Sequence, residues 1–346
     1  MSSEHSARRK PMYPVGPALR GYLEDHARWL RLPVVYGDLL RHDGLLPRRD
    51  AAGRETLWNT VVLRPSDRDE LHDRLVALYQ LLIADGRPID HLAIAGIDHC
   101  LYGNSQPFRI KVLNQLNDNH DYYYIKKADA SRIYGLELEH LLSPNRINYM
   151  VGEGTLVEEH IIGVPGDDFI AAPGHYHGNL NPVRLSKEFV KFNERCYVRL
   201  LGDMRAYNFV VDVIQDFDQV QYRLRSIDFD QQCYEGRYRN YLPQFFKENR
   251  PYVELAQRTI GVETSAQYAN EERALLRKRF RLAQDDLGAL FAVMRTEELA
   301  PADHVARLAG ELAEQHGLPV VRTCHTMGAL LELHLRHRLE LDLPVP

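Results

Sequence analysis

The sequence predicts an α+β protein in which a sheet-rich segment lies between two mainly helical ones. Short β-like runs separated by turn residues fill residues 89–164, and apolar residues recur at helical spacing before and after them. One helical pattern, residues 131–142, interrupts these runs, so the expected order is strand, strand, strand, helix, strand, strand. Strands followed by a long helical segment are typical of the α+β class.

The first segment, residues 1–90, is expected to be a helical extension that begins with a loose tail of about fifteen residues. Its clearest helix covers residues 66–86, SDRDELHDRLVALYQLLIADG. Ser66 or Asp67 can cap the start, and Gly86 can end the helix. Apolar side chains recur three and four residues apart, which indicates a scaffold helix with one buried face.

The second segment, residues 91–165, is expected to form a small lobe built on an antiparallel sheet. Its β-like runs are HLAIAGI, FRIKVLNQL, YYYIKKA, RINYMVGE and TLVEEHIIGV. Residues 117–120, Asn-Asp-Asn-His, lie between the second and third runs and predict a hairpin turn.

The third segment, residues 166–346, is expected to form a larger and mainly helical lobe. Helical patterns cover residues 186–201, 270–295 and 303–340. Two further β-like runs, FVVDVI and YRLRSIDF, are separated by acidic turn residues and predict a hairpin. His175 and His177 lie in a Gly- and Pro-rich connector without a third ligand nearby, so we expect an exposed loop there rather than a zinc site.

The composition excludes several classes of protein. The chain has 346 residues, of which 45% are hydrophobic and 26% are charged, as in soluble globular proteins. Its 43 basic and 48 acidic residues give a formal net charge of -5, so a dedicated nucleic-acid binder is not expected. No apolar run suggests a membrane span or a secretory signal. The four cysteines form no Cys-x-x-Cys pair, and we expect a reduced, cytoplasmic protein.

Residues 199–232 carry the clearest candidate site, because the signatures of P-loop nucleotidases, nicotinamide dehydrogenases, α/β-hydrolases and zincins are all absent. Asn208 and Asp228 supply an amide oxygen and a carboxylate, the hard ligands that a divalent cation needs between phosphate oxygens. Asp203 could orient an attacking hydroxyl and accept its proton. Asp230 could also touch the metal. The plainer interpretation is that these Asp and Asn side chains cap loops.

At these residues the chain resembles the protein-kinase-like superfamily, and most closely its bacterial aminoglycoside and choline kinase branches. Leu201-Gly202-Asp203-Met204-Arg205-Ala206-Tyr207-Asn208 matches their H-G-D-x-x-x-x-N catalytic loop, and Ile227-Asp228-Phe229-Asp230 matches their I-D-F/W-D/G metal motif. Leu201 stands where the family commonly has His. The resemblance covers about residues 95–235 and implies a two-lobed kinase-like fold.

The resemblance also implies a lysine that binds phosphate and a glutamate that pairs with this lysine. The run Tyr-Tyr-Tyr-Ile-Lys-Lys, residues 122–127, looks like the strand that carries the lysine. We favour Lys126 because it directly follows an aliphatic residue, whereas Lys127 would point to the opposite face. On the following helix Glu137 falls on the apolar side and Glu139 mostly outside it, so Glu137 is the expected partner. The plainer interpretation of Lys126 is a protective charge on an edge strand.

Two further nucleotide contacts follow from the resemblance. The segment LVEEHIIGVPG, residues 156–166, looks like the family's strand and hinge, whose backbone groups bond adenine. This role is carried over to Glu159, His160 and Ile161. The loop Tyr102-Gly103-Asn104-Ser105 could cover the phosphates, with Ser105 and backbone N–H groups as donors, although it lacks the three-glycine pattern.

The implied activity is transfer of the γ-phosphoryl group of ATP, with Mg²⁺, to a hydroxyl group of a small molecule or a protein. ATP would bind between the two lobes, and no nucleic acid or membrane partner is expected. Three alternatives remain. A pseudokinase that only senses nucleotide is favoured by Leu201 and the poor Gly-rich loop. AMP transfer by the same fold is the second, and a helical interaction module with a vestigial cleft is the third.

Overall fold

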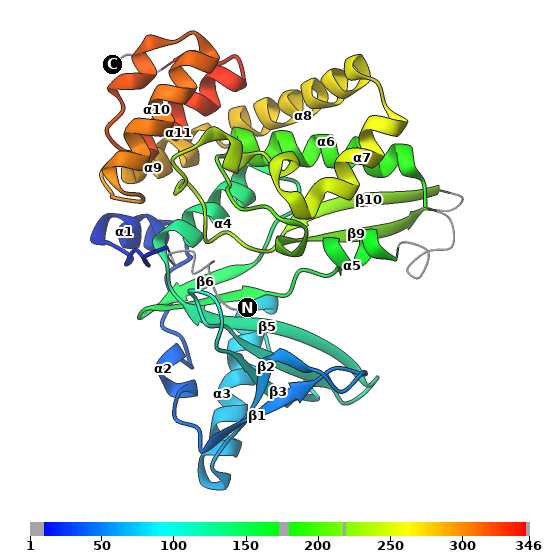
Figure 1. Cartoon of the computed structure of the whole chain (residues 1–346). Coiled ribbons are helices and arrows are strands. Elements are labelled where there is room, and N and C mark those ends of the chain that lie inside the picture. Colours follow the sequence, from blue (N-terminus) through cyan, green and yellow to red (C-terminus); the bar gives the residue numbers. More distant parts are fainter. Residues whose placement is uncertain (1–9, 173–179, 217–218, 344–346) are drawn as a thin grey trace, which may run out of the picture. The chain divides into compact units, whose positions relative to one another are not determined.

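The computed structural model describes residues 10–172, 180–216 and 219–343, and it is α+β, as the sequence predicts (Figure 1). The chain divides into two compact units. Unit 1 consists of Met1–Ala130 and Ile147–His160, and unit 2 of Ser131–Arg146 and Ile161–Pro346. No helix of the described ranges is both long enough and apolar enough to span a bilayer.

Unit 1 is built on a seven-stranded antiparallel sheet in the order β1-β2-β3-β4-β5-β7-β6. Its strands are β1 (Gly44–Arg49), β2 (Glu55–Val62), β3 (Leu92–Cys100), β4 (Phe108–Asn114), β5 (Asn119–Lys127), β6 (Tyr149–Gly152) and β7 (Thr155–Glu159). The predicted hairpin at residues 117–120 is confirmed, since Asn114 pairs with Asn119 across the turn between β4 and β5.

Three helices accompany the sheet of unit 1, namely α1 (Pro17–Asp25), α2 (Tyr36–Leu39) and α3 (Pro65–Ala84). Leu75 and Leu78 of α3 are buried in one hydrophobic core with Phe108 and Tyr123 of the sheet. The Tyr123 hydroxyl also donates a 2.8 Å hydrogen bond to the carbonyl of Leu75. The helix predicted over residues 66–86 is therefore a scaffold helix.

The start of α3 differs from the prediction. Neither Ser66 nor Asp67 caps it, because the helix begins one residue earlier at Pro65, whose fixed φ and missing N–H suit a first helical position. Asp85 follows the helix in the left-handed conformation at a φ of 50°, and Gly86 follows at 77°. Gly86 thus lies at the predicted end.

The prediction that residues 1–90 are a helical extension is wrong for β1 and β2. These strands extend the sheet of unit 1, with Trp58 to Thr60 of β2 paired to β3. Thr, Trp and Val in β2 favour a pleated, half-buried surface, and the sheet beside them supplies the pairing. The prediction of a loose tail is also wrong from Lys10 onward, because Lys10 is buried and its Nζ lies 3.0 Å from Asp129 Oδ2.

Unit 2 is mainly helical and contains a small three-stranded sheet, in the order β10-β9-β8. Its helices are α4 (Ala130–Leu142, whose first residue belongs to unit 1), α5 (Gly166–Ala171), α6 (Pro182–Val198), α7 (Arg250–Thr259), α8 (Val262–Leu282), α9 (Gln284–Met294), α10 (Ala302–His316) and α11 (Met327–Arg338). Its strands are β8 (Val164–Pro165), β9 (Phe209–Asp216) and β10 (Gln219–Ser226). The predicted hairpin and the helix predicted over residues 131–142 are both confirmed.

The units do not follow the predicted boundaries at residues 90 and 165. Residues before 90 share the sheet of unit 1, and the chain enters unit 2 at Ile161 rather than after residue 165. Helix α4, expected in the small lobe, belongs to unit 2 from Ser131 onward.

Candidate functional site

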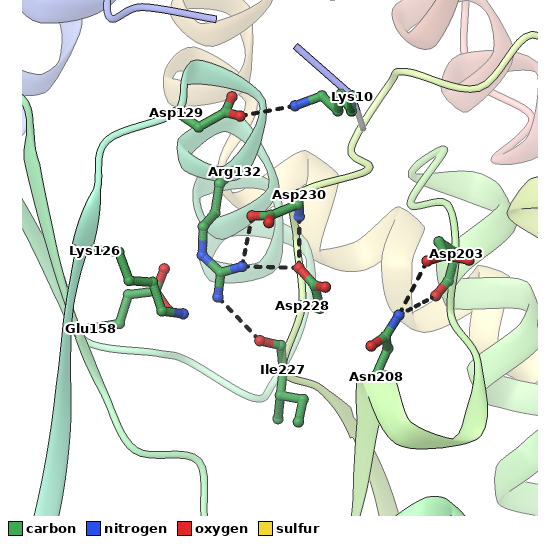
Figure 2. A network of polar contacts seen from close by, with 10 residues as sticks. All are labelled: Lys10, Lys126, Asp129, Arg132, Glu158, Asp203, Asn208, Ile227, Asp228 and Asp230. Carbon is green, nitrogen blue, oxygen red and sulfur yellow. Dashed lines mark hydrogen bonds and ion pairs between the residues drawn. The ribbon is translucent and has the colours of Figure 1, made fainter. Parts of the chain in front are cut away.

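The β9–β10 hairpin brings the predicted metal-binding residues together at one end. Phe209, the first residue of β9, pairs with Ser226, the last residue of β10. Beyond this pair the Ile227 N–H donates a 3.0 Å hydrogen bond to the Asn208 carbonyl. Asp228 is the next residue, so it lies beside Asn208, and Figure 2 shows the two side chains close together.

Asp203, in the loop before β9, lies at the same end of the hairpin. The Asn208 side-chain Nδ2 donates to the Asp203 carbonyl at 2.7 Å and lies 3.4 Å from Asp203 Oδ2 (Figure 2). Asp203 adopts the left-handed conformation with a φ of 55°, which Asp tolerates better than most residues. Arg205, which the sequence analysis did not single out, donates from Nε to Asp203 Oδ1 at 2.6 Å and from Nη1 to Glu248 at 3.0 Å.

The Asp203 loop is tied to the chain that follows Asp228. Gln232 Nε2 donates to the Arg199 carbonyl at 2.6 Å, and the Cys233 N–H donates to the Leu200 carbonyl at 3.0 Å. Leu201 is 1% exposed and forms a backbone bridge with Gln232. Its apolar side chain therefore helps to fix the loop that carries Asp203.

Asp228 is held by an arginine that the sequence analysis missed. Arg132 Nη1 lies 3.0 Å from Asp228 Oδ1 and 2.9 Å from Asp230 Oδ1, and its Nη2 donates to the Ile227 carbonyl at 3.1 Å (Figure 2). The Asp230 N–H donates to the same Asp228 Oδ1 at 3.0 Å. The sequence signal for Arg132 is a basic residue in the first turn of α4.

These residues fit a divalent cation that is bound together with phosphate. The side chains of Asp203 and Asp228 are 32% and 36% exposed, so both can meet a ligand. Asn208 Nδ2 makes the contacts to Asp203, so Oδ1 is the atom of this amide that could bind a cation. Within those ranges no three His, Cys, Asp or Glu side chains are arranged to hold a metal ion. Two oxygen ligands suit Mg²⁺, which keeps water and substrate phosphates as its other ligands.

The predicted phosphate-binding lysine lies in unit 1. Lys126 on β5 is 7% exposed, and its Nζ donates to Glu158 Oε2 on β7 at 2.6 Å. Glu158 is thus a partner that the sequence analysis did not name. The expected partner Glu137 is buried in unit 2, and its pairing with Lys126 stays a prediction. Lys127 points to the other face, as predicted, where its Nζ lies 5.4 Å from the centre of the Tyr36 ring.

The argument that separated Glu137 from Glu139 is wrong, although the choice of Glu137 is not tested. Both glutamates are buried, at 2% and 3% exposed. Glu139 accepts a hydrogen bond from Arg199 Nη1. Residues of α4 from Ala130 to Glu139 are buried on every face, so a helical wheel with one apolar arc could not sort its charged residues.

Two backbone donors of the predicted adenine-binding segment are already occupied. The Glu159 N–H donates to the Asn148 carbonyl at 3.0 Å, and the His160 N–H donates to the Tyr122 carbonyl at 3.3 Å. These two N–H groups thus continue the pairing of β7, and the role of Glu159 and His160 in binding adenine through their backbone groups stays a prediction. Ile161 is buried at the start of the unit 2 segment, and its role stays a prediction.

The loop predicted to cover phosphates is anchored to β5. The Lys127 N–H donates to the Ser105 carbonyl at 3.2 Å, and Ser105 is 6% exposed. Gly103 in the same loop has a φ of 81°, a conformation that favours glycine. The donor role of Ser105 stays a prediction. His175 and His177 lie outside the described residues.

No family model matches the sequence, and no curated protein matches it either. The function is therefore argued from the geometry of the site.

Proposed function

We propose that the chain is a kinase-like phosphotransferase that uses ATP and Mg²⁺ to phosphorylate a hydroxyl group of a small molecule or a protein. The observation that carries this proposal is the meeting of Asp203, Asn208 and Asp228 at one end of the β9–β10 hairpin (Figure 2). Further support comes from the order of elements that follow α3, which is three strands, one helix and two strands.

Each residue has a separate role in the proposed reaction. Asn208 Oδ1 and the Asp228 carboxylate would hold the cation, which when bound neutralises charge on phosphate oxygens. Asp203 would orient the acceptor hydroxyl and take its proton. The acceptor oxygen forms a bond to the γ-phosphorus as the bond between that phosphorus and the β–γ bridging oxygen breaks, and ADP leaves. Lys126, which is bonded to Glu158, would bind nucleotide phosphate.

A nucleotide-binding pseudokinase is the second candidate. Arg205 already bonds the Asp203 carboxylate at 2.6 Å, so the proposed base is engaged before an acceptor binds. Leu201 cannot donate a hydrogen bond as the family's His can. These contacts favour binding without turnover, so turnover must be measured directly.

The test uses ATP labelled either on the α- or on the γ-phosphate, incubated with the full chain, Mg²⁺ and a panel of sugars, choline, aminoglycosides and proteins. Transfer of the γ-label alone supports the kinase, and transfer of the α-label indicates AMP transfer. Stabilisation by Mg²⁺ and ATP without transfer of either label supports the pseudokinase. If Mg²⁺ and ATP neither react nor stabilise the chain, a helical interaction module is the better interpretation.

A further inference from the structure

Arg132 places a permanent positive charge against the proposed cation ligand. Its side chain is 3% exposed, and its guanidinium group contacts the carboxylates of Asp228 and Asp230 (Figure 2). A guanidinium group is not deprotonated in proteins, so this charge does not vary with pH. The carboxylate that would hold a divalent cation therefore lies beside a cation that is built into α4.

The fold holds Arg132 in this position. A Cβ added at Gly135, one helical turn after Arg132, would lie 2.8 Å from the Phe229 Cβ. Phe229 itself is 1% exposed, and it separates Asp228 from Asp230 in the sequence. Because α4 and this segment are packed so closely, the backbone of Arg132 is held at a fixed position beside the two carboxylates.

The charges at this point discriminate between a free cation and a cation bound to nucleotide. Arg132 offsets one of the two negative charges that Asp228 and Asp230 carry. A free divalent cation would be repelled by Arg132, and the repulsion is stronger here than in bulk water because the guanidinium group is buried. A cation bound to ATP arrives with an excess of negative charge, which Arg132 attracts.

We propose that Arg132 makes this site selective for a divalent cation that arrives with a nucleotide, by lowering its affinity for the free cation. The inference rests on the proposed function, since it assumes that Asp228 binds a cation. Arg132 then determines specificity without being a ligand. Asp230 serves as its second anchor, with a side chain that is only 14% exposed.

The experiment measures Mn²⁺ binding to the full chain by electron paramagnetic resonance, because Mn²⁺ takes the same oxygen ligands as Mg²⁺. Titrations are run with and without a non-hydrolysable ATP analogue. The wild type should bind Mn²⁺ at least tenfold more tightly with the nucleotide than without it. Arg132→Met should strengthen binding of free Mn²⁺ by about tenfold, equivalent to ~1.4 kcal/mol, and reduce the coupling to nucleotide. Arg132→Lys, which keeps the charge, should resemble the wild type.

Two further variants control for changes in folding. Arg199→Met removes another buried arginine that bonds a glutamate of α4, and it should leave free Mn²⁺ binding unchanged. Asp230→Asn removes one negative charge and should weaken free Mn²⁺ binding, the opposite sign to Arg132→Met. This second variant keeps the proposal testable if Arg132→Met does not fold.

The inference is overturned if Arg132→Met leaves the affinity for free Mn²⁺ unchanged or lowers it, or if Arg132→Lys behaves like Arg132→Met. An Asp230→Asn variant that binds free Mn²⁺ as well as the wild type overturns it too. A wild type that binds Mn²⁺ neither alone nor with nucleotide contradicts the proposed function as well. The wild-type titrations therefore show whether the cation site itself is absent or whether only the proposed role of Arg132 is wrong.

Discussion

Unit 2 contains two clusters of arginine–carboxylate pairs that differ in the exposure of their acids. In the α6 cluster, Arg195 bonds Glu272 and Arg199 bonds Glu139, and all four side chains are 2–6% exposed. In the hairpin cluster, Arg132 is equally buried at 3%, but its partner Asp228 is 36% exposed. The arginines are alike, but Asp228 is far more exposed than Glu139 and Glu272.

This difference indicates which charges serve the fold and which serve a ligand. An ion pair enclosed on both sides has no face left for another molecule, and burying it gives little net stability even though breaking it is costly. An exposed carboxylate that is paired with a buried arginine keeps a fixed orientation and can still contact a ligand. We therefore expect substitutions in the α6 cluster to change stability, and those in the hairpin cluster to change binding and turnover.

The largest effect is expected from a substitution of Asp203, which lies at the same end of the β9–β10 hairpin as Asp228. Asp203→Ala should lower the rate of γ-phosphoryl transfer by about 10²–10⁴-fold, because the acceptor hydroxyl loses the group that orients it and takes its proton. Nucleotide affinity, measured by calorimetry, should change little. Full turnover in this variant would show that Asp203 is not the base.

The next largest effect should be on stability, in the α6 cluster. Arg199→Met leaves the buried Glu139 without its partner and should lower the free energy of unfolding by about 3–5 kcal/mol. Arg132→Met should cost less, because water can reach Asp228. Urea denaturation of both variants checks the order, and equal losses would remove the distinction between the clusters.

Gly135 links α4 to the hairpin cluster by close packing. Gly135→Ala would place its Cβ 2.8 Å from the Phe229 Cβ, so it should destabilise the chain by about 1–3 kcal/mol and weaken binding of the Mg²⁺–nucleotide complex. Gly288→Ala in α9 is the matched control, since no atom lies within 4 Å of its added Cβ. The control should be neutral or stabilising, and a similar result for both glycines would contradict the packing argument.

Acid should destabilise the chain around α6, where two histidines form consecutive hydrogen bonds. His316 Nε2 lies 3.0 Å from His334 Nδ1, and His334 Nε2 lies 2.9 Å from the Tyr197 carbonyl. Burial lowers the pKa of His316 to about 4 and holds the pKa of His334 well below its ordinary value. The unfolded chain therefore binds more protons below about pH 6.5, so stability is lost as the pH falls from there toward 4.

The effect between pH 7.5 and 6 should be the smallest of the four, because each histidine of the unfolded chain, with an ordinary pKa of about 6.5, takes up less than one proton in that range. Urea midpoints at several pH values would measure it. His316→Gln should make the dependence shallower. A midpoint that stays constant from pH 7.5 to 5 would contradict the role of this pair.

The sequence predicted which segments form helices and strands better than it predicted which segments and side chains contact one another. The hairpin end was predictable because Asn208 and Asp228 flank two strands with a clear alternating pattern. The partners Arg132, Arg205 and Glu158 were not predictable, since their roles depend on how α4, the Asp203 loop and β7 pack. β1 and β2 were missed because their pairing comes from a sheet whose other strands lie later in the chain.

The most direct test of the account is a calorimetric titration of a non-hydrolysable ATP analogue into the full chain, with and without Mg²⁺. The wild type should bind the analogue in a Mg²⁺-dependent way, and Asp228→Asn should weaken this binding by at least about tenfold, or ~1.4 kcal/mol. Asp212→Asn, on β9 of the same hairpin, should bind like the wild type. Absence of Mg²⁺-dependent binding, or an Asp228→Asn variant that binds as tightly as the wild type, would contradict the account.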